Sequence, residues 1–169
     1  MNMKVLYNNK EIINGQFISP QNSQSKPIVN YLACSNTLYT LIMHDPDAPS
    51  GNHLHWIVIN IPGNNINDGN TLLQYIGPSP PNGSGTHKYI FLLIEQREKK
   101  YLQPIQRAMS MDNLFAKLNL KDSAVISRVY FTSSNQTAGK KRNRTRSKSV
   151  SKKQKTINLK KRTKKRAPI

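Results

Sequence analysis

Three short apolar runs constrain the fold of this 169-residue chain more than any other feature. Residues 38–43, 56–61 and 89–94 are rich in β-branched and aromatic side chains, and turn-forming residues flank all three runs. Six residues is the length of a strand rather than of a helix. Because each run is almost continuously apolar, both faces of these strands should be covered, as in the centre of a sheet. We therefore predict a mainly β fold.

Other elements are predicted more weakly. Residues 125–132 alternate between apolar and polar side chains, which predicts a strand with one polar face. Apolar residues recur at helical spacing over 111–120, where Asp112 is expected as the N-cap, and a weaker helix is predicted over 70–75. Long connections rich in Pro, Gly, Asn and Ser separate the strands, and connections of this length are often functional loops.

The charge of the chain is concentrated at its C-terminal end. The net charge is +18, from 26 basic and 8 acidic residues, and residues 139–169 hold 15 of the basic residues and no acid. This segment has too few large apolar residues to offset the entropy of ordering, so we predict that it is disordered when free. We therefore divide the chain into a nearly neutral domain at 1–138 and a basic tail at 139–169.

Composition excludes several classes of protein. Cys34 is the only cysteine, which excludes an internal disulfide and a zinc site built from several thiolates. No apolar run reaches the length of about 20 residues that a transmembrane helix needs. The N-terminus lacks the apolar core of a secretory signal, so we expect an intracellular protein, cytoplasmic or nuclear, that is not secreted. A virion location stays open if the source is a DNA virus.

Three polar segments at strand ends carry the chemistry. Asp45 follows the first apolar run, while His55 and His87 precede the second and the third. If these strands are neighbours, one carboxylate and two imidazoles converge at one rim of the sheet. A nearby carboxylate favours a charged imidazolium, which donates strong hydrogen bonds to anions. We therefore predict a small preformed anion pocket, where Gly83 and Gly85 let the backbone approach a ligand.

The same segments resemble the phosphatidylethanolamine-binding protein family, which includes the Raf-kinase-inhibitor-type proteins of animals and the flowering-time regulators of plants. The resemblance rests on Asp-Pro-Asp-Ala-Pro at 45–49, on His-Leu-His-Trp-Ile-Val at 53–58 and on the Gly-Pro-Ser-Pro-Pro stretch that continues to residue 89. Lys88 stands where the family usually has Arg, and the family's C-terminal helix is not recognisable. The resemblance covers about residues 1–132.

This resemblance implies a central antiparallel sheet, a second small sheet and a few peripheral helices. It also implies a pocket for phosphate-like or other anionic groups. Carried over by position, the ligand-binding residues are Asp45, Pro46, Asp47, Pro49, His55, Pro80, Pro81, His87 and Tyr89. By analogy we expect at least one cis X–Pro bond in the loop 45–49.

Catalysis and metal binding are less favoured interpretations. The sequence has no Gly-x-Ser-x-Gly elbow of the kind that presents a nucleophilic serine. His53 and His55 would share one face of a strand and could chelate a metal, but His53 is expected in an exposed loop. An Asx turn after Pro46 would explain Asp47 without a ligand, and Trp56 is expected in the core. We therefore expect no enzyme activity, no cofactor and no metal.

The leading hypothesis is a regulatory, non-enzymatic protein that binds a phosphate-bearing lipid headgroup or a phosphorylated ligand. An alternative is a nucleic-acid-associated protein whose tail contacts phosphates without sequence preference, and the same tail would suit an anionic membrane. A third hypothesis is a regulator that docks on a kinase or another protein through its surface.

Overall fold

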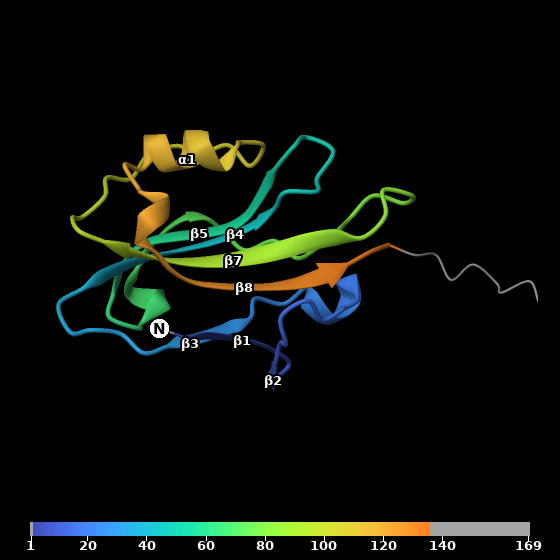
Figure 1. Ribbon diagram of the computed structural model, residues 1–169, viewed down its shortest axis with the longest axis horizontal. Helices are drawn as coiled ribbons and strands as arrows, with labels where there is room; N and C mark the ends of the chain where they lie inside the picture. The colour runs from blue at the N-terminus through green and yellow to red at the C-terminus, as the bar shows by residue number, and fades with distance from the viewer. Residues whose placement is uncertain (1, 136–169) are drawn as a thin grey trace, which may run out of the picture. The chain divides into compact units, whose positions relative to one another are not determined.

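The computed structural model describes residues 2–135. The predicted tail at 139–169 and its boundary at residue 138 lie outside the described residues, so both stay predictions. No helix within residues 2–135 has the length and apolar character needed to cross a bilayer. The described chain forms two antiparallel sheets and one α-helix, which confirms the predicted mainly β fold (Figure 1).

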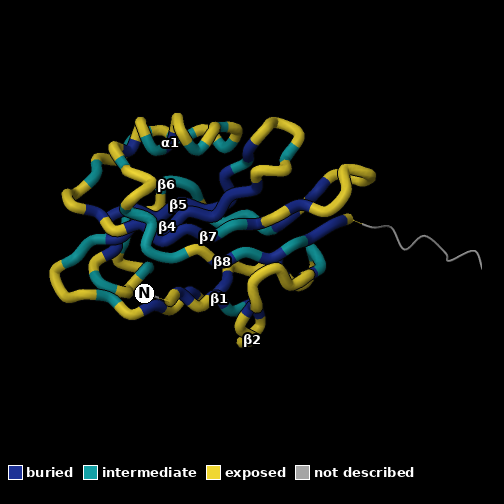
Figure 2. The backbone as a smooth tube through the Cα atoms, in the orientation of Figure 1, coloured by how far each residue is buried: buried dark blue, intermediate teal, exposed yellow. Residues whose placement is uncertain are grey.

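The larger sheet has five strands in the order β6-β5-β4-β7-β8. Its strands are β4 (Leu38–Asp45), β5 (His53–Pro62), β6 (Asn70–Leu73), β7 (His87–Gln96) and β8 (Val125–Ser133). The four predicted strands lie within β4, β5, β7 and β8 and are confirmed. Figure 2 shows the central strands buried and the connections largely exposed, as continuous apolar runs require.

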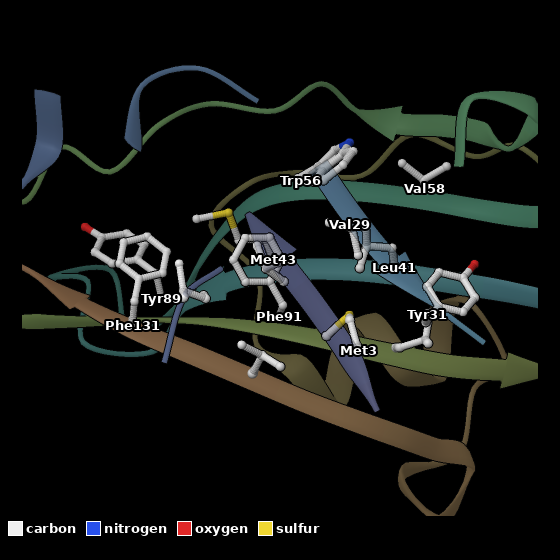
Figure 3. Close-up of a cluster of buried hydrophobic side chains, with 14 of the residues drawn as sticks. Met3, Val29, Tyr31, Leu41, Met43, Trp56, Val58, Tyr89, Phe91 and Phe131 are labelled. Atoms are coloured by element: carbon white, nitrogen blue, oxygen red, sulfur yellow. The ribbon is translucent and has the colours of Figure 1, made fainter. Parts of the chain in front are cut away.

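The smaller sheet covers one face of the larger sheet. It contains β1 (Met3–Tyr7), β2 (Lys10–Glu11) and β3 (Ile28–Tyr31) in the order β2-β1-β3. Buried side chains from both sheets form one apolar cluster, drawn in Figure 3, which includes Met3, Val29, Tyr31, Leu41, Met43, Trp56, Phe91 and Phe131. The core position predicted for Trp56 is confirmed by its exposure of only 3%.

The helix α1 (Met111–Lys117) covers the opposite face of the larger sheet. Leu114 and Leu118 pack there against a second cluster of buried side chains from β4, β5 and β7. The prediction of Asp112 as N-cap is wrong. The helix begins two residues earlier than that cap requires, so Ser110 Oγ accepts a hydrogen bond from Asn113 N at 3.2 Å, and Asp112 lies inside the first turn.

The weak helix predicted over 70–75 is also wrong, because residues 70–73 form the edge strand β6. Leu73 pairs with Ile57, and Asn70 pairs with Ile59. The backbone hydrogen bonds that fix this strand come from β5, so local helical propensity does not decide its structure. Short 3₁₀ helices complete the described chain at Pro20–Ser23, Ile66–Asp68 and Asp122–Ala124.

Candidate functional site

Three strand ends meet at one edge of the larger sheet. β4 lies between β5 and β7 and is antiparallel to both, so the end of β4 lies beside the starts of its two neighbours (Figure 1). Asp45 is the last residue of β4, and His53 and His87 are the first residues of β5 and β7. This edge surrounds a cavity of about 330 Å³, called the edge cavity below.

The edge cavity brings together seven of the nine residues predicted as ligand-binding. These are Asp45, Pro49, His55, Pro80, Pro81, His87 and Tyr89. Pro46 and Asp47 do not line it. The sequence interpretation missed the remaining lining residues, which are Ala48, Ser50, His53, Ile76, Gly77 and Ser79. His53 was expected in an exposed loop, but it begins β5 and is only half-exposed, so that expectation is wrong.

The centre of the site is a buried pair formed by Asp45 and His87. His87 Nδ1 donates to Asp45 Oδ2 at 2.7 Å, and the two side chains are 1% and 4% exposed. Asp45 Oδ1 also accepts from the backbone nitrogen of Asp47 at 2.9 Å. A buried carboxylate needs such donors because it has lost its water. The Asx turn is therefore formed by the side chain of Asp45, whereas the sequence interpretation assigns it to Asp47.

Asp47 has a different structural role, since its Oδ2 accepts from the backbone nitrogen of Lys88 at 2.8 Å. This bond ties the loop after β4 to the start of β7. The expected cis X–Pro bond in this loop is not found, because every peptide bond among residues 2–135 is trans.

Ser84 forms a hydrogen bond with the second ring nitrogen of His87. Ser84 Oγ lies 2.8 Å from His87 Nε2 and 2.7 Å from the carbonyl oxygen of Pro81. A hydroxyl carries one proton and a carbonyl can only accept, so Ser84 donates to Pro81 and accepts from His87. In this arrangement both ring nitrogens of His87 donate, one to Asp45 and one to Ser84.

The chain Asp45–His87–Ser84 has the connectivity of a catalytic triad, but the direction of its protons is different. In a triad the serine donates to a neutral histidine, which then acts as a base. Here Ser84 donates to Pro81, and His87 has no free lone pair to accept a proton. The arrangement holds His87 as a donor and does not activate Ser84 as a nucleophile.

His55 differs from the prediction of a second imidazolium. Its Nδ1 lies 2.9 Å from the carbonyl oxygen of Ile76, so this nitrogen carries a proton and donates. Burial lowers the pKa of His55 to about 4, with smaller lowering from His53 and Arg107, and the hydrogen bond to Ile76 opposes the shift. His55 is therefore neutral at pH 7. No residue among 2–135 hydrogen-bonds its Nε2, which offers a lone pair.

Tyr89 lines the edge cavity beside His55. Its ring meets that of His55 edge-on, with centroids 5.1 Å apart. Burial is the main cause that raises the pKa of Tyr89, and the charge and hydrogen bonding of Asp45 raise it further. The hydroxyl therefore stays protonated at neutral pH and is a donor.

Arg107 forms hydrogen bonds with the backbone that carries His55, and it was not identified from the sequence. Its guanidinium donates to the carbonyl oxygens of Leu54, His55 and Gln74 at 2.9, 3.2 and 2.9 Å. These bonds tie the start of β5 to the chain that leaves β6. A half-buried arginine without an acidic partner carries no sequence signal, because its acceptors are backbone atoms.

Metal binding has no further support among the described residues. His53 and His55 do share a face, with ring centroids 5.1 Å apart, as their spacing predicts. Within residues 2–135, however, no three side chains of His, Cys, Asp or Glu gather in a way that could hold a metal ion.

Sequence comparisons identify relatives of this chain. The family model described as phosphatidylethanolamine-binding protein matches residues 8–143. The tomato (Solanum lycopersicum) protein SELF-PRUNING is 34% identical over 151 residues, which cover 83% of this chain and 85% of the relative. The rice (Oryza sativa subsp. japonica) protein MOTHER of FT and TFL1 homolog 2 is 39% identical over 106 residues, or 59% of this chain. That match spans only 60% of the rice protein.

Solved structures share the fold. A carboxypeptidase Y inhibitor, solved with its cognate proteinase, superposes with a TM-score of 0.64 at 22% identity, over 78% of this chain and 82% of the inhibitor. The phosphatidylethanolamine-binding protein from Plasmodium vivax gives a TM-score of 0.59 at 21% identity, over 78% and 83% of the two chains. Together with the match of the family model over most of its length, these similarities show that the chain belongs to the phosphatidylethanolamine-binding protein family.

Proposed function

We propose that this chain is a regulatory, non-catalytic binding protein whose edge cavity takes a small phosphate-bearing ligand. The observation that carries the proposal is the buried Asp45–His87 pair, whose outer nitrogen is held only by Ser84. Such a nitrogen donates a charge-assisted hydrogen bond to a phosphate oxygen, and this bond is stronger than one to a hydroxyl. A phosphate would therefore displace Ser84.

The loop that carries Ser84 supports this displacement. Gly83 and Gly85 have φ angles of +79° and +86°, and a Cβ atom added at either would meet nothing within 4 Å. The loop is therefore not packed against the rest of the domain. Its hydroxyl can leave His87 at the loss of one hydrogen bond, whose net contribution is about 1 kcal/mol.

His55 adds a second requirement for the ligand. Its free Nε2 is an acceptor at neutral pH, so the ligand should bring a proton donor as well as a phosphate. A primary ammonium group meets this requirement, and so does the P–OH of a phosphomonoester monoanion. O-phosphorylethanolamine carries both a phosphate and an ammonium. The chemistry of the edge cavity thus fits the headgroup in the name of the family.

The experiment is a calorimetric titration of the full chain with O-phosphorylethanolamine. His87→Ala should weaken binding at least tenfold, since it removes the donor to the phosphate. His44→Ala is the matched control, because His44 is a buried histidine of β4 whose Nδ1 contacts Asn52 at 2.8 Å, outside the edge cavity. Equal affinity of the wild type and His87→Ala would refute the proposal.

Titrations with inorganic phosphate and with ethanolamine alone separate the two halves of the ligand. We expect weaker binding of each half than of the whole headgroup. The comparisons give no support to the alternative of a nucleic-acid-associated protein. Deletion of residues 139–169 discriminates between the two classes, because only a nucleic-acid protein that acts through its tail should lose all of its partner binding.

A further inference from the structure

Two adjoining hollows lie at the end of the larger sheet opposite the edge cavity. They have volumes of about 340 and 560 Å³ and share Glu98, Lys100 and Asn119. The chain that follows β7 and the end of α1 form their walls. β7 has ten residues and runs from His87 to the end that borders the hollows, so at about 3.3 Å per residue the two ends lie about 30 Å apart.

The walls of these hollows carry unpaired positive charge. Lys100 is neutralised, since its Nζ donates to Glu98 Oε1 at 3.1 Å and to the carbonyl oxygen of Asn119 at 3.0 Å. Four further cations have no acid within 4.0 Å among the described residues, and these are Arg97, Lys99, Lys117 and Lys121. This charge is complementary to an anionic partner.

Two consecutive apolar side chains are exposed in the segment that forms this basic wall. Tyr101 is 89% exposed and Leu102 is 67% exposed, and Tyr101 lines the larger hollow with Lys99 and Lys117. Figure 2 shows much of the segment after β7 as exposed. Single exposed apolar residues are common on protein surfaces, but this neighbouring pair follows Arg97 and Lys99 in the chain, and Lys117 lines the same hollow as Tyr101.

This combination matches the chemistry of an anionic bilayer. Tyrosine is favoured at the boundary between headgroups and acyl chains, and lysine side chains reach the headgroup phosphates from the side. Leu102 lies outside the lining of both hollows, so it does not fill a groove in which an acidic peptide would lie. An outward leucine gains from burial only where the partner offers an apolar phase.

We propose that this surface docks the protein on anionic lipid membranes. The membrane surface, as it is called below, consists of Arg97, Lys99, Tyr101, Leu102, Lys117 and Lys121. It is separate from the edge cavity, which lies at the other end of β7 and stays open to a ligand from solution. The inference does not depend on the proposed function.

The test measures binding of the full chain to phosphatidylcholine vesicles with and without phosphatidylserine. Removing two apolar contacts with the bilayer in the double variant Tyr101→Ser/Leu102→Ser should lower the partition coefficient on phosphatidylserine vesicles about tenfold. The matched control is Ile13→Ser/Leu32→Ser, which replaces apolar residues that are 75% and 81% exposed in the other sheet region. We expect less than a twofold change from it.

The basic tail predicted at 139–169 should also attract anionic lipid, and salt separates the two contributions. Screening weakens attraction between exposed charges, whereas apolar insertion persists. The loss caused by Tyr101→Ser/Leu102→Ser should therefore persist in high salt. Charge reversal in Lys117→Glu/Lys121→Glu should lower binding at least tenfold at low salt. Wild-type binding by the first double variant, or equal losses from the control, would overturn the proposal. So would binding of polyglutamate but not of vesicles.

Discussion

The three central strands carry a polar cluster at each end, and the two clusters differ in how far their hydrogen-bonding groups are satisfied within the protein. One end holds Asp45, His55 and His87 around the edge cavity. The other end holds a buried amide cluster of Thr40, Asn60 and Gln96. Both clusters consist of polar side chains that are almost completely buried, so burial alone does not distinguish a binding site from a structural network.

The amide cluster is closed. Gln96 Oε1 accepts from Asn60 N at 2.7 Å and from Thr40 Oγ1, and Gln96 Nε2 donates to Asn60 Oδ1 at 3.0 Å. Asn60 Oδ1 also accepts from the backbone of Lys100 at 2.7 Å, and Asn60 Nδ2 donates to Asn70 Oδ1 at 2.9 Å. Every amide group has its partners inside the protein, so nothing is left for a ligand.

The edge cavity is open by contrast. His55 Nε2 has no partner among residues 2–135, and His87 Nε2 is satisfied only by Ser84 from an exposed loop. A satisfied network stabilises the fold, whereas unsatisfied or easily displaced groups bind ligands. The number of open hydrogen-bonding positions therefore separates the candidate site from the structural cluster.

The largest effect is expected from Gln96→Leu. This change leaves the buried Asn60 N and Thr40 Oγ1 without partners, so we expect a loss of roughly 2–4 kcal/mol in the free energy of unfolding. Urea denaturation measures it. The matched control is Gln103→Leu, which loses one exposed bond to the carbonyl of Lys117 and should change stability by less than about 1 kcal/mol. Similar effects of both variants would remove the contrast between the clusters.

A smaller effect on the free energy of unfolding is expected when the pH is lowered. The unfolded chain binds a proton at His55 near pH 6.5, but the folded chain binds it only near pH 4, so unfolding is favoured as the pH falls through this window. The stability contribution of His55 is present above pH 6.5. About 2 kcal/mol of it should be lost between pH 7 and pH 5.

Urea denaturation of the wild type and of His55→Phe at both pH values measures this term. Phenylalanine preserves an edge-on contact with Tyr89 but cannot titrate. The variant should lose about 2 kcal/mol less stability than the wild type on acidification. His44 remains as a second buried histidine with a lowered pKa in both proteins, so its contribution cancels. Identical pH dependence of the two proteins would contradict the assignment of a buried neutral His55.

The smallest effect is expected from Ser84→Ala. Removing the hydroxyl that competes for His87 Nε2 should tighten binding of O-phosphorylethanolamine about fivefold, which corresponds to one net hydrogen bond of about 1 kcal/mol. The control is Ser123→Ala, at an exposed serine that does not line the edge cavity. Weaker binding by Ser84→Ala would mean that the hydroxyl contacts the ligand instead of competing with it.

The sequence predicts the parts of the fold that long-range contacts do not decide. β4, β5 and β7 are predicted because strands buried on both faces need continuous apolar runs. β6 is not predicted, since its hydrogen bonds come from β5. The strands β1 and β3 are short and buried on one face only, which leaves a weak pattern in the sequence.

For the site, the sequence predicts which residues meet but not which of their ring nitrogens carry protons. The convergence of Asp45 and His87 follows from their positions at adjacent strand ends. The tautomer of His55 does not, because the carbonyl that fixes it belongs to Ile76, 21 residues away. Ser84 does carry a local signal that was missed, namely its place between two glycines and three residues before His87.

The most direct test is NMR of the histidine side-chain nitrogens in the full chain, with and without O-phosphorylethanolamine. The free protein should show His55 as a neutral ring protonated at Nδ1 down to about pH 5. The ligand should shift His55 Nε2 and His87 Nε2 while leaving the His44 signals in place. A His55 that gains its proton near pH 6.5, or a ligand that shifts neither ring, would contradict a cavity built around one donor and one acceptor.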